Sequence, residues 1–296
     1  MDLSIITINY NSYELTKETI KSIFKYPPSC EYEIFLVDNN SHDDSLNKLK
    51  VVFDFEIKNK LIKLIPLSKN KGFANGNNEA IKQSNGDFIL LLNNDTEVLK
   101  DSLTNTFNYI YKNENIGALG CKIILPDGSL DMAARRNFPN PKNSFYKLFG
   151  LSKIINKING DKNDLNSYNI TNLDENGIYE VDSLVGAFML LRKTTLNEIG
   201  LLDESFFMYG EDIDLCYRIK ESGWKVVYYG KNIIIHHKGT SKKQKTKLIY
   251  HFYKSMYIFF NKHYRNSYSF LTKAIIYFGI GVLFIIKVVL NIFKRK

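Results

Sequence analysis

The sequence feature that most constrains the fold is a short apolar run, Phe88–Leu92, that ends abruptly in Asn93, Asn94 and Asp95. A run of this length between polar residues predicts a strand buried on both faces, as in a sheet of parallel strands. Ligands bind beyond the carboxyl ends of such strands in open α/β sheets. Asp95 is therefore predicted to lie at the mouth of a site, although a buried strand followed by a polar turn has the same pattern.

Other apolar segments alternate with helical patterns in the same way. Ser41, followed three residues later by Asp44, predicts a capping box that opens a short helix. This alternation predicts an α/β fold built from parallel strand–helix–strand units. The N-terminal half is predicted to contain strands at 4–10, 33–37, 61–65 and 116–124, and helices at 13–24, 72–84 and 100–111.

The pattern of strands and helices is less regular after residue 124. Residues 135–178 are rich in Asn, Lys, Ser and Pro, which predicts a long loop or small insertion over the site. Strand character resumes over 179–191, where Gly186 and Ala187 are small enough for a ligand or another backbone to approach. Further strands are predicted at 225–229 and 233–235.

Two common nucleotide-binding classes lack their signatures here. The first strand is followed by Asn11-Ser12-Tyr13, without the glycine-rich turn of Rossmann oxidoreductases and methyltransferases, and the chain has no P-loop. A nucleotidyltransferase would need a basic, glycine-rich triphosphate loop near the first strand, which is also missing. The phosphates of a bound nucleotide would then need another cation, and Asp95 suggests a metal ion.

Acidic and histidine side chains mark two more segment ends. Glu211, Asp212 and Asp214 lie in the first turn of a predicted helix, where the helix dipole and an i,i+4 pair with Arg218 account for one or two of the acids. Three acids directly after an aromatic cluster favour a catalytic role. His236 follows a predicted strand, and such a histidine is a candidate metal ligand.

Taken together, these motifs resemble the family 2 glycosyltransferases of GT-A fold, and most closely their rhamnosyltransferase-like branch. The resemblance runs from Leu3 to about Ser241, and it lies in the order of the motifs rather than in any one of them. It implies a Rossmann-like, mostly parallel mixed sheet flanked by helices. The motifs are Ile6–Asn11, Val37–Ser41, Lys71–Asn77, Asn93–Asp95, Gly186–Leu190, Glu211–Leu215 and His236–Gly239.

The resemblance also implies an activity, a hexosyltransferase-type inverting transfer from a UDP- or dTDP-sugar to a hydroxyl of a glycan or lipid-linked acceptor. Asp212 would be the general base, supported by Glu211 and Asp214, and Asp95 with His236 would bind Mg²⁺ or Mn²⁺. Gly186 and Ala187 would line the pocket for acceptor and sugar. The nucleotide sugar would be bound by Thr7, Tyr10, Asn11, Asp38, Gly72, Asn75, Asn77 and Asn94.

The metal motif departs from the family pattern in one respect. The family usually offers two acids separated by one residue, whereas Asn93 and Asn94 leave Asp95 alone. We therefore expect modest metal affinity, and we prefer His236 over His237 as its partner. The departure also motivates an alternative, a non-catalytic GT-A scaffold that binds a nucleotide or glycan at the membrane.

Charge divides the chain at Glu221, its last acidic residue. Residues 222–296 hold 15 Lys and Arg, whereas residues 1–221 hold 25 basic and all 31 acidic residues, a net charge of −6. An acidic body with a basic, aromatic tail indicates an anionic membrane surface rather than nucleic acid as the partner. We therefore predict a catalytic domain over 1–241 and a membrane-associating helical region over 242–296.

The apolar run Ala274–Ile286 has 13 residues, fewer than the roughly 20 that span a bilayer. An interfacial helix is preferred over a spanning one, with a helix packed on the catalytic domain as the third possibility. Three widely spaced cysteines and no basic segment before the first strand predict a reduced protein without a signal peptide. The predicted location is the cytoplasmic face of the cell membrane, in synthesis of a cell-surface polysaccharide, and the oligomeric state is left open.

Overall fold

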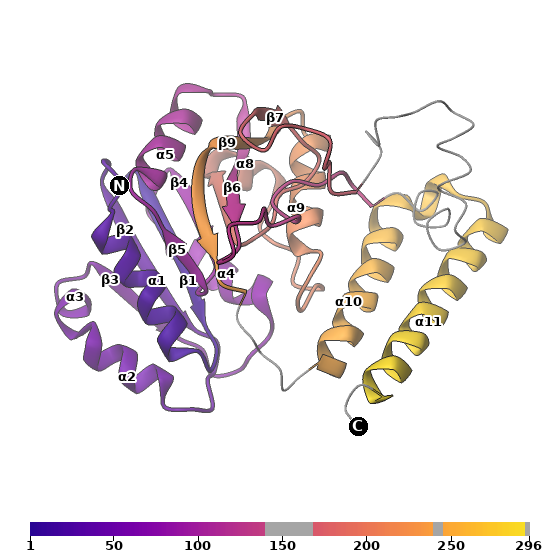
Figure 1. Ribbon diagram of the computed structural model, residues 1–296, viewed down its shortest axis with the longest axis horizontal. Helices are drawn as coiled ribbons and strands as arrows, with labels where there is room; N and C mark the ends of the chain where they lie inside the picture. Colours follow the sequence, from indigo (N-terminus) through magenta and orange to yellow (C-terminus); the bar gives the residue numbers. More distant parts are fainter. Residues whose placement is uncertain (140–167, 239–244, 294–296) are drawn as a thin grey trace.

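The computed structural model describes residues 1–139, 168–238 and 245–293. Most of the insertion predicted over 135–178 lies outside these ranges, as do the first lysines of the basic tail and residues 294–296. The described chain forms one mixed α/β sheet with helices against it, and a pair of long C-terminal helices at its side (Figure 1). This architecture confirms the fold class expected from the sequence.

The sheet has the strand order β3-β2-β1-β4-β8-β6-β9-β5, and β7 pairs with β9. The first four strands in this order are parallel, β8 is antiparallel to both neighbours, and β5 and β7 are antiparallel to β9. The strands are β1 (Leu3–Asn9), β2 (Tyr32–Asp38), β3 (Ile62–Pro66), β4 (Phe88–Leu92), β5 (Thr96–Val98), β6 (Ile116–Ile124), β7 (Ile178–Glu180), β8 (Phe188–Arg192) and β9 (Lys225–His236).

Helices follow most of the strands, as the alternation of patterns predicted. All five residues of β4 are buried, so the apolar run does form a strand covered on both faces. The helices are α1 (Tyr13–Lys25), α2 (Ser45–Val52), α3 (Asp54–Lys58), α4 (Phe73–Ile81), α5 (Ser102–Lys112), α8 (Lys193–Ile199), α9 (Glu211–Glu221), α10 (Lys245–Phe259) and α11 (Phe270–Phe293), with a π-helical turn at Phe260–Tyr264 and a 3₁₀ turn at Arg265–Ser267.

The capping box predicted at Ser41 is wrong. Helix α2 begins at Ser45, and its N-cap Asp44 makes no side-chain capping bond. The hydroxyl of Ser41 instead donates to Asp38 Oδ1 at 2.6 Å, and its backbone N–H donates to Asp38 Oδ2 at 3.0 Å. The serine therefore serves the end of β2, because a buried carboxylate competes for its donors more strongly than a helix three residues away.

The two strands predicted at 225–229 and 233–235 are one strand. Strand β9 runs from Lys225 to His236 and pairs with β6, with a shift of register between Tyr229 and Ile233. Such a bulge interrupts the period-two pattern and makes one strand look like two. The amide of Asn232, in the bulge, donates to the carbonyl of Ser102 at 2.7 Å, which ties the irregular segment to α5.

A tight backbone crossing positions the loop before α9. The N–H of Phe73 donates to the carbonyl of Phe207 at 2.8 Å, and a Cβ added to Gly72 would lie 2.2 Å from that oxygen. In the same loop, Tyr209 has φ of 69° and Gly210 has φ of 88°, both in the left-handed region. Backbone strain at a bulky residue such as Tyr209 persists only when the surroundings hold it in place.

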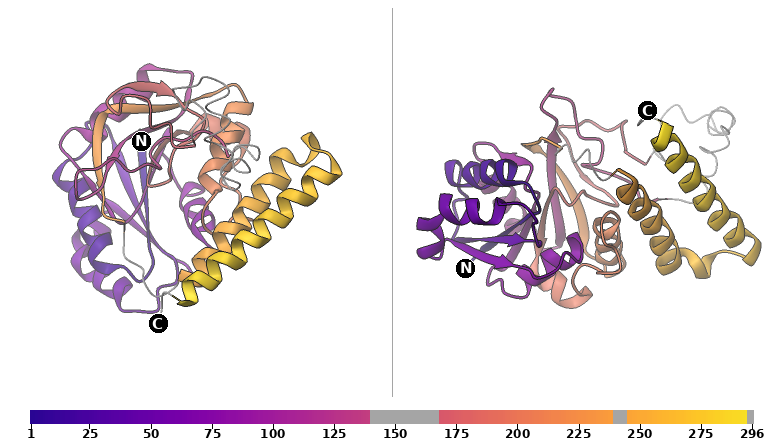
Figure 2. Two further views of the ribbon diagram at one scale, coloured as in Figure 1. Left: turned by 45° about the vertical axis from the view of Figure 1, so that its right-hand side comes forward. Right: turned by 90° about the horizontal axis from the view of Figure 1, so that it is seen from below.

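The C-terminal helices α10 and α11 form an antiparallel hairpin, in which α10 lies between the rest of the protein and α11 (Figures 1 and 2). The two helices contact each other along most of their length. At one end Asn291 donates a 3.0 Å hydrogen bond to Thr246, and toward the other end the ring of Tyr257 contacts that of Tyr277. Helix α11 has 24 residues, and its most apolar window of 18 residues has a mean hydropathy of 2.4 and contains no buried residue. By length and composition it is the one helix in the described chain able to cross a membrane.

We predict that Gly72→Ala destabilises the protein by at least about 3 kcal/mol, because it combines an unfavourable φ with overlap onto the Phe207 carbonyl. Gly128→Ala is the matched control, since Gly128 also has positive φ but a Cβ there would meet nothing within 4 Å. That control should cost only about 1–2 kcal/mol. Urea unfolding measures both, and equal losses would contradict the importance of the crossing.

Candidate active site

The carboxyl ends of β1 and β2 carry a hydrogen-bonded group of polar side chains. Asn9, fully buried, donates from Nδ2 to Asp38 Oδ1 at 2.7 Å and to the hydroxyls of Ser41 and Ser45. Together with the two bonds from Ser41, these contacts fix the carboxylate of Asp38, which is only 2% exposed. A carboxylate has about four acceptor positions, so Asp38 retains capacity for one more donor.

The network continues from β1 to the end of β4. The hydroxyl of Thr16 donates to Asn9 Oδ1 at 2.9 Å and accepts a bond from Asn94 Nδ2 at 2.8 Å. One residue before Asn94, the N–H of Asn93 donates to the carbonyl of Ala187 at 3.0 Å. The ends of β1, β2 and β4 and the start of β8 are thus joined by a continuous chain of contacts.

Asp95 and His236 meet where β5 pairs with β9. Asp95 Oδ1 lies 3.1 Å from His236 Nε2, and Asp131 Oδ2 lies 3.0 Å from the other ring nitrogen, Nδ1. Burial lowers the pKa of His236, but the two carboxylates outweigh it and raise the pKa to about 9. A carboxylate on Nδ1 leaves Nε2 directed at Asp95, which is the arrangement that orients a metal-binding histidine.

The neighbouring histidine has different contacts. His237 is exposed, its Nε2 lies 3.3 Å from Glu97 Oε2, and its backbone N–H donates to the carbonyl of Asp95 at 2.8 Å. Within residues 1–139, 168–238 and 245–293, no three His, Cys, Asp or Glu side chains gather around one metal position. Asp95 and His236 would therefore supply two protein ligands, and a cation there would need oxygens from a bound substrate or water.

Asp212, in the first turn of α9, is held by a buried ion pair. Arg136 donates from a terminal nitrogen to Asp212 Oδ2 at 2.7 Å, and the backbone N–H of Gly186 lies 3.3 Å from the same oxygen. The second carboxylate oxygen, Oδ1, accepts the N–H of Ile213 at 2.8 Å. The geometry thus places both Gly186 and a cation, Arg136, beside Asp212.

The neighbouring acid, Glu211, has no such partner. Its Oε2 is buried without a hydrogen-bond partner in the described chain. Burial raises the pKa of Glu211, and the nearby charge of Asp212 raises it further, to about 8. The protonated form of Glu211 is thus favoured relative to an ordinary glutamate, whereas Asp212 is paired with a cation.

Asp214 faces the C-terminal hairpin. Its carboxylate is fully buried and contacts Arg218 at 2.9 Å, Lys262 at 2.8 Å and His263 at 2.7 Å. Burial raises the pKa of Asp214, but these donors outweigh it and lower the pKa to about 2. The i,i+4 pair with Arg218 is as expected, and the two residues of the π-helical turn join α9 to the hairpin.

Other residues assigned to the nucleotide site lie near this edge with varied contacts. Thr7 is fully buried, and its hydroxyl has no hydrogen-bond partner among the residues that the structure describes. Tyr10 is half-buried with its ring 6.3 Å from that of His42, and Asn11 is exposed with φ of 51°. In α4, Asn75 donates to Glu204 at 2.8 Å and Asn77 donates to the carbonyl of Phe73 at 3.0 Å. These two side-chain amides are thus engaged within the protein.

Three residues that the sequence motifs did not single out are central to the site. Asn9 ends β1, Asp131 follows the turn after β6, and Arg136 lies at the start of the segment predicted to be a loop. Arg136 is 7% exposed and is bridged through its backbone to Ser183. There was little reason in the sequence to expect Arg136 in the site, because two adjacent arginines, Arg135 and Arg136, are usually exposed to solvent.

Comparison with known proteins identifies the family. Residues 4–176 match the family model described as Glycosyl transferase family 2, which covers more than half of the chain. The chain therefore belongs to glycosyltransferase family 2.

The relatives with assigned names act in glycan synthesis. The chain is 27% identical over 232 residues to the low-salt glycan biosynthesis hexosyltransferase Agl10 of Haloferax volcanii, covering 74% of this chain and 62% of that protein. It is 27% identical over 211 residues to the N-acetylglucosaminyl-diphospho-decaprenol L-rhamnosyltransferase of Mycobacterium tuberculosis. That match covers 67% of this chain and 66% of that protein. The chain thus spans less than two thirds of the length of either relative.

Solved structures share the fold at lower identity. GalNAc-T7, crystallised with UDP, GalNAc and Mn²⁺, superposes with a TM-score of 0.60 at 17% identity, over 81% of this chain and 44% of that one. The mannosyltransferase PcManGT of Pyrobaculum calidifontis, in complex with GDP-Man and Mn²⁺, superposes with a TM-score of 0.59 at 14% identity. The match covers 86% of this chain and 64% of that one. These likenesses support the GT-A-type architecture.

We predict that Asp131→Asn weakens Mn²⁺ binding by about 10–100-fold, because the carboxylate that orients His236 is lost while both proposed ligands remain. Asp127→Asn is the control, since Asp127 lies exposed in the turn just before. Mn²⁺ titration followed by electron paramagnetic resonance, in the presence of UDP, measures both variants. Unchanged affinity in Asp131→Asn would show that His236 does not need this carboxylate.

Asp214→Asn should lower the free energy of unfolding at pH 7 by about 3–5 kcal/mol, because it removes a fully buried carboxylate that pairs with the partly buried Arg218 and Lys262. A carboxyl whose folded pKa is depressed stabilises above its unfolded pKa, about 3.9, and this stabilisation is lost as pH falls through the folded pKa, about 2. The difference between wild type and variant should therefore shrink between pH 4 and pH 2.

The control for this variant is Asp54→Asn. Asp54 contacts Lys58 at 2.7 Å, but both side chains are exposed, so the loss should stay below about 1 kcal/mol. Chemical denaturation in a non-ionic detergent measures the three proteins. A gap between wild type and Asp214→Asn that stays constant down to pH 2 would contradict the role of ion pairing.

Proposed function

We propose that this protein is an inverting glycosyltransferase that moves a hexose or deoxyhexose, with rhamnose as one candidate, from a UDP- or dTDP-sugar to a hydroxyl of a glycan or lipid-linked acceptor. The observation that carries the proposal is the chain of contacts joining Asp38, Asp95 and Asp212 at one edge of the sheet. These are the positions at which the family binds base, diphosphate and acceptor. Relatives in glycan biosynthesis support a setting in cell-surface polysaccharide synthesis.

Asp38 is proposed to accept the imide N–H of a uracil or thymine. Its carboxylate is held by Asn9 and Ser41, so it is fixed before the base arrives, and this reduces the entropy lost on binding. Thr7, Tyr10 and Asn11 come from the same strand and the turn after it. Thr7 is the member of this group with a buried, unpartnered hydroxyl in the described chain.

Asp95 and His236 are proposed to hold Mg²⁺ or Mn²⁺, with Asp131 fixing the ring of His236. When bound, a divalent cation supplies a Lewis acid that stabilises the charge of the leaving diphosphate. The donor set of one carboxylate and one imidazole fits such a cation, and solved neighbours with Mn²⁺ support the assignment. The geometry also supports His236 over His237, since the latter pairs with Glu97.

Asp212 is proposed to take the proton of the acceptor hydroxyl as its oxygen attacks the anomeric carbon. Arg136 and the Gly186 N–H orient the carboxylate, which fixes the direction of proton transfer. The same cation already occupies one oxygen of the Asp212 carboxylate. Glu211, with its raised pKa, is therefore the alternative base.

The proposed location is the cytoplasmic face of the cell membrane. Helix α11 is exposed and apolar, and α10 holds it along its length. The hairpin contacts the catalytic body through His251 of α10 and through His263 of the π-helical turn. A helix fixed in this way favours lying in the plane of the membrane over spanning it. The polar residues Lys273, Lys287 and Asn291 lie near the α10 side, opposite the exposed Phe278 and Ile285.

A panel of nucleotide sugars tests the function. Full-length protein is incubated with UDP-, dTDP- and GDP-sugars, with and without a chelator, and both hydrolysis and transfer to lipid-linked acceptors are measured. We expect turnover of a pyrimidine nucleotide sugar that the chelator suppresses. Tight nucleotide binding without turnover of any donor would instead support the non-catalytic scaffold.

We predict that Asp212→Asn lowers kcat by about 10²–10⁴-fold while donor affinity stays within a few-fold, because its charge acts chiefly in the transition state. Glu211→Gln is the matched control, since its raised pKa favours the neutral form and an uncharged side chain there should be tolerated. Steady-state kinetics between pH 6 and pH 9 measure both. A near-normal kcat in Asp212→Asn with a large loss in Glu211→Gln would make Glu211 the base.

A further inference from the structure

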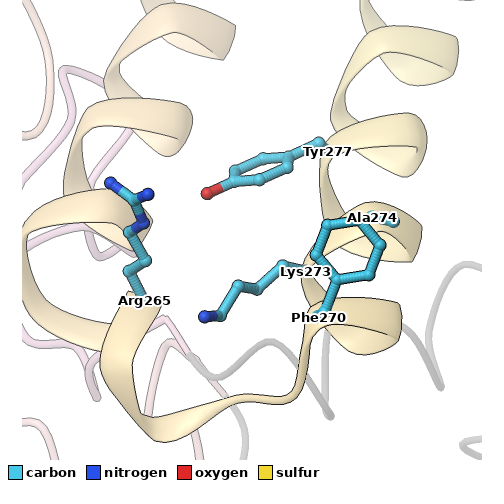
Figure 3. Close-up of a pocket in the computed structure, with 5 residues that line it drawn as sticks. All are labelled: Arg265, Phe270, Lys273, Ala274 and Tyr277. Atoms are coloured by element: carbon cyan, nitrogen blue, oxygen red, sulfur yellow. The ribbon is translucent and has the colours of Figure 1, made fainter.

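A cavity of about 360 Å³ opens at the turn of the C-terminal hairpin. Its lining comes from the 3₁₀ turn and the first two turns of α11. In Figure 3, Lys273 extends from α11 toward the turn, and Arg265 extends along the opposite wall to the height of the Tyr277 hydroxyl. None of its lining residues is among those proposed to act in the transfer. Its lining residues are Arg265, Phe270, Lys273, Ala274 and Tyr277.

The two cations of this cavity are not neutralised within the described chain. Arg265 and Lys273 form no ion pair there, and the sequence has no acidic residue after Glu221. The neighbouring Lys262 is different, because it contacts Asp203 at 2.6 Å and Asp214 at 2.8 Å. The cavity therefore combines two positive charges that remain available to an external anion.

The rest of the lining is apolar and partly rigid. The hydroxyl of Tyr277 donates to Asn261 Oδ1 at 2.7 Å, and its ring lies 5.6 Å from that of Phe260, so this wall is fixed by the hairpin. At the rim, Phe270 is 86% exposed and Leu271 is 70% exposed, at the start of the apolar surface of α11. A ligand for this site needs an anionic group beside an apolar chain.

We propose that this cavity binds the phosphate of an anionic membrane phospholipid. Arg265 and Lys273 would donate charge-assisted hydrogen bonds to the phosphate oxygens, and the acyl chain would lie along Phe270 and Ala274. The proposal rests on the membrane location given above, and it adds a specific lipid site to a general attraction. It places the turn of the hairpin at the depth of the phosphate groups, with the exposed face of α11 among the acyl chains.

Vesicle binding tests the site with full-length protein. Phosphatidylcholine vesicles with and without phosphatidylglycerol are compared by flotation for wild type, Arg265→Gln/Lys273→Gln and Lys254→Gln/Lys287→Gln. The control pair removes the same charge from exposed positions of the same hairpin outside the cavity. We expect the cavity pair to lose at least about tenfold more affinity for phosphatidylglycerol vesicles than the control pair.

Each alternative outcome overturns the site in a distinguishable way. Equal losses in the two double variants mean that the hairpin contributes diffuse charge only. Displacement from vesicles by inorganic phosphate, but not by chloride at the same ionic strength, means that the site takes a soluble anion. If the wild-type protein binds neither kind of vesicle, both the lipid site and the membrane location are wrong. The transferase function is tested separately, by donor turnover in the nucleotide-sugar assay. Equal thermal stability and equal donor turnover of the three proteins exclude misfolding.

Discussion

The ion pair between Arg136 and Asp212 is the interaction on which the arrangement of the active site depends. It joins the segment after β6 to the first turn of α9, and the same aspartate oxygen lies beside the N–H of Gly186 before β8. Both partners are buried, so removing either one leaves an uncompensated charge, at a cost of about 3–5 kcal/mol. A carboxylate held in this way is fixed in one rotamer. A directed proton transfer requires such a fixed orientation.

Helix α9 is also held from its other side. Asp214, two residues after Asp212, faces Lys262 and His263, while Tyr217 packs its ring 4.1 Å from that of His263. The helix that carries the proposed base is therefore fixed between the catalytic body and the hairpin. Because α11 belongs to that hairpin, the proposed membrane-facing surface and the candidate active site are connected through α9.

The sequence predicted those features that depend on local pattern. The strand at Phe88–Leu92, the polar residues after it and the pair of Asp214 with Arg218 all follow from short-range spacing. Arg136 and Asp131 were missed because their partners, Asp212 and His236, lie 76 and 105 residues away. Ser41 was misassigned for the same reason: its role is set by the buried carboxylate of Asp38 and the distant Asn9.

The central claim is that Asp38, Asp95 and His236 form one site for a pyrimidine nucleoside diphosphate and a divalent cation. Titration calorimetry of uridine and thymidine diphosphate into the full-length protein, with and without Mn²⁺, tests it most directly. The account predicts binding that requires Mn²⁺, is lost in Asp95→Asn and is weakened in Asp38→Asn. Binding that is equal with and without Mn²⁺, or no binding of either nucleotide, would contradict it.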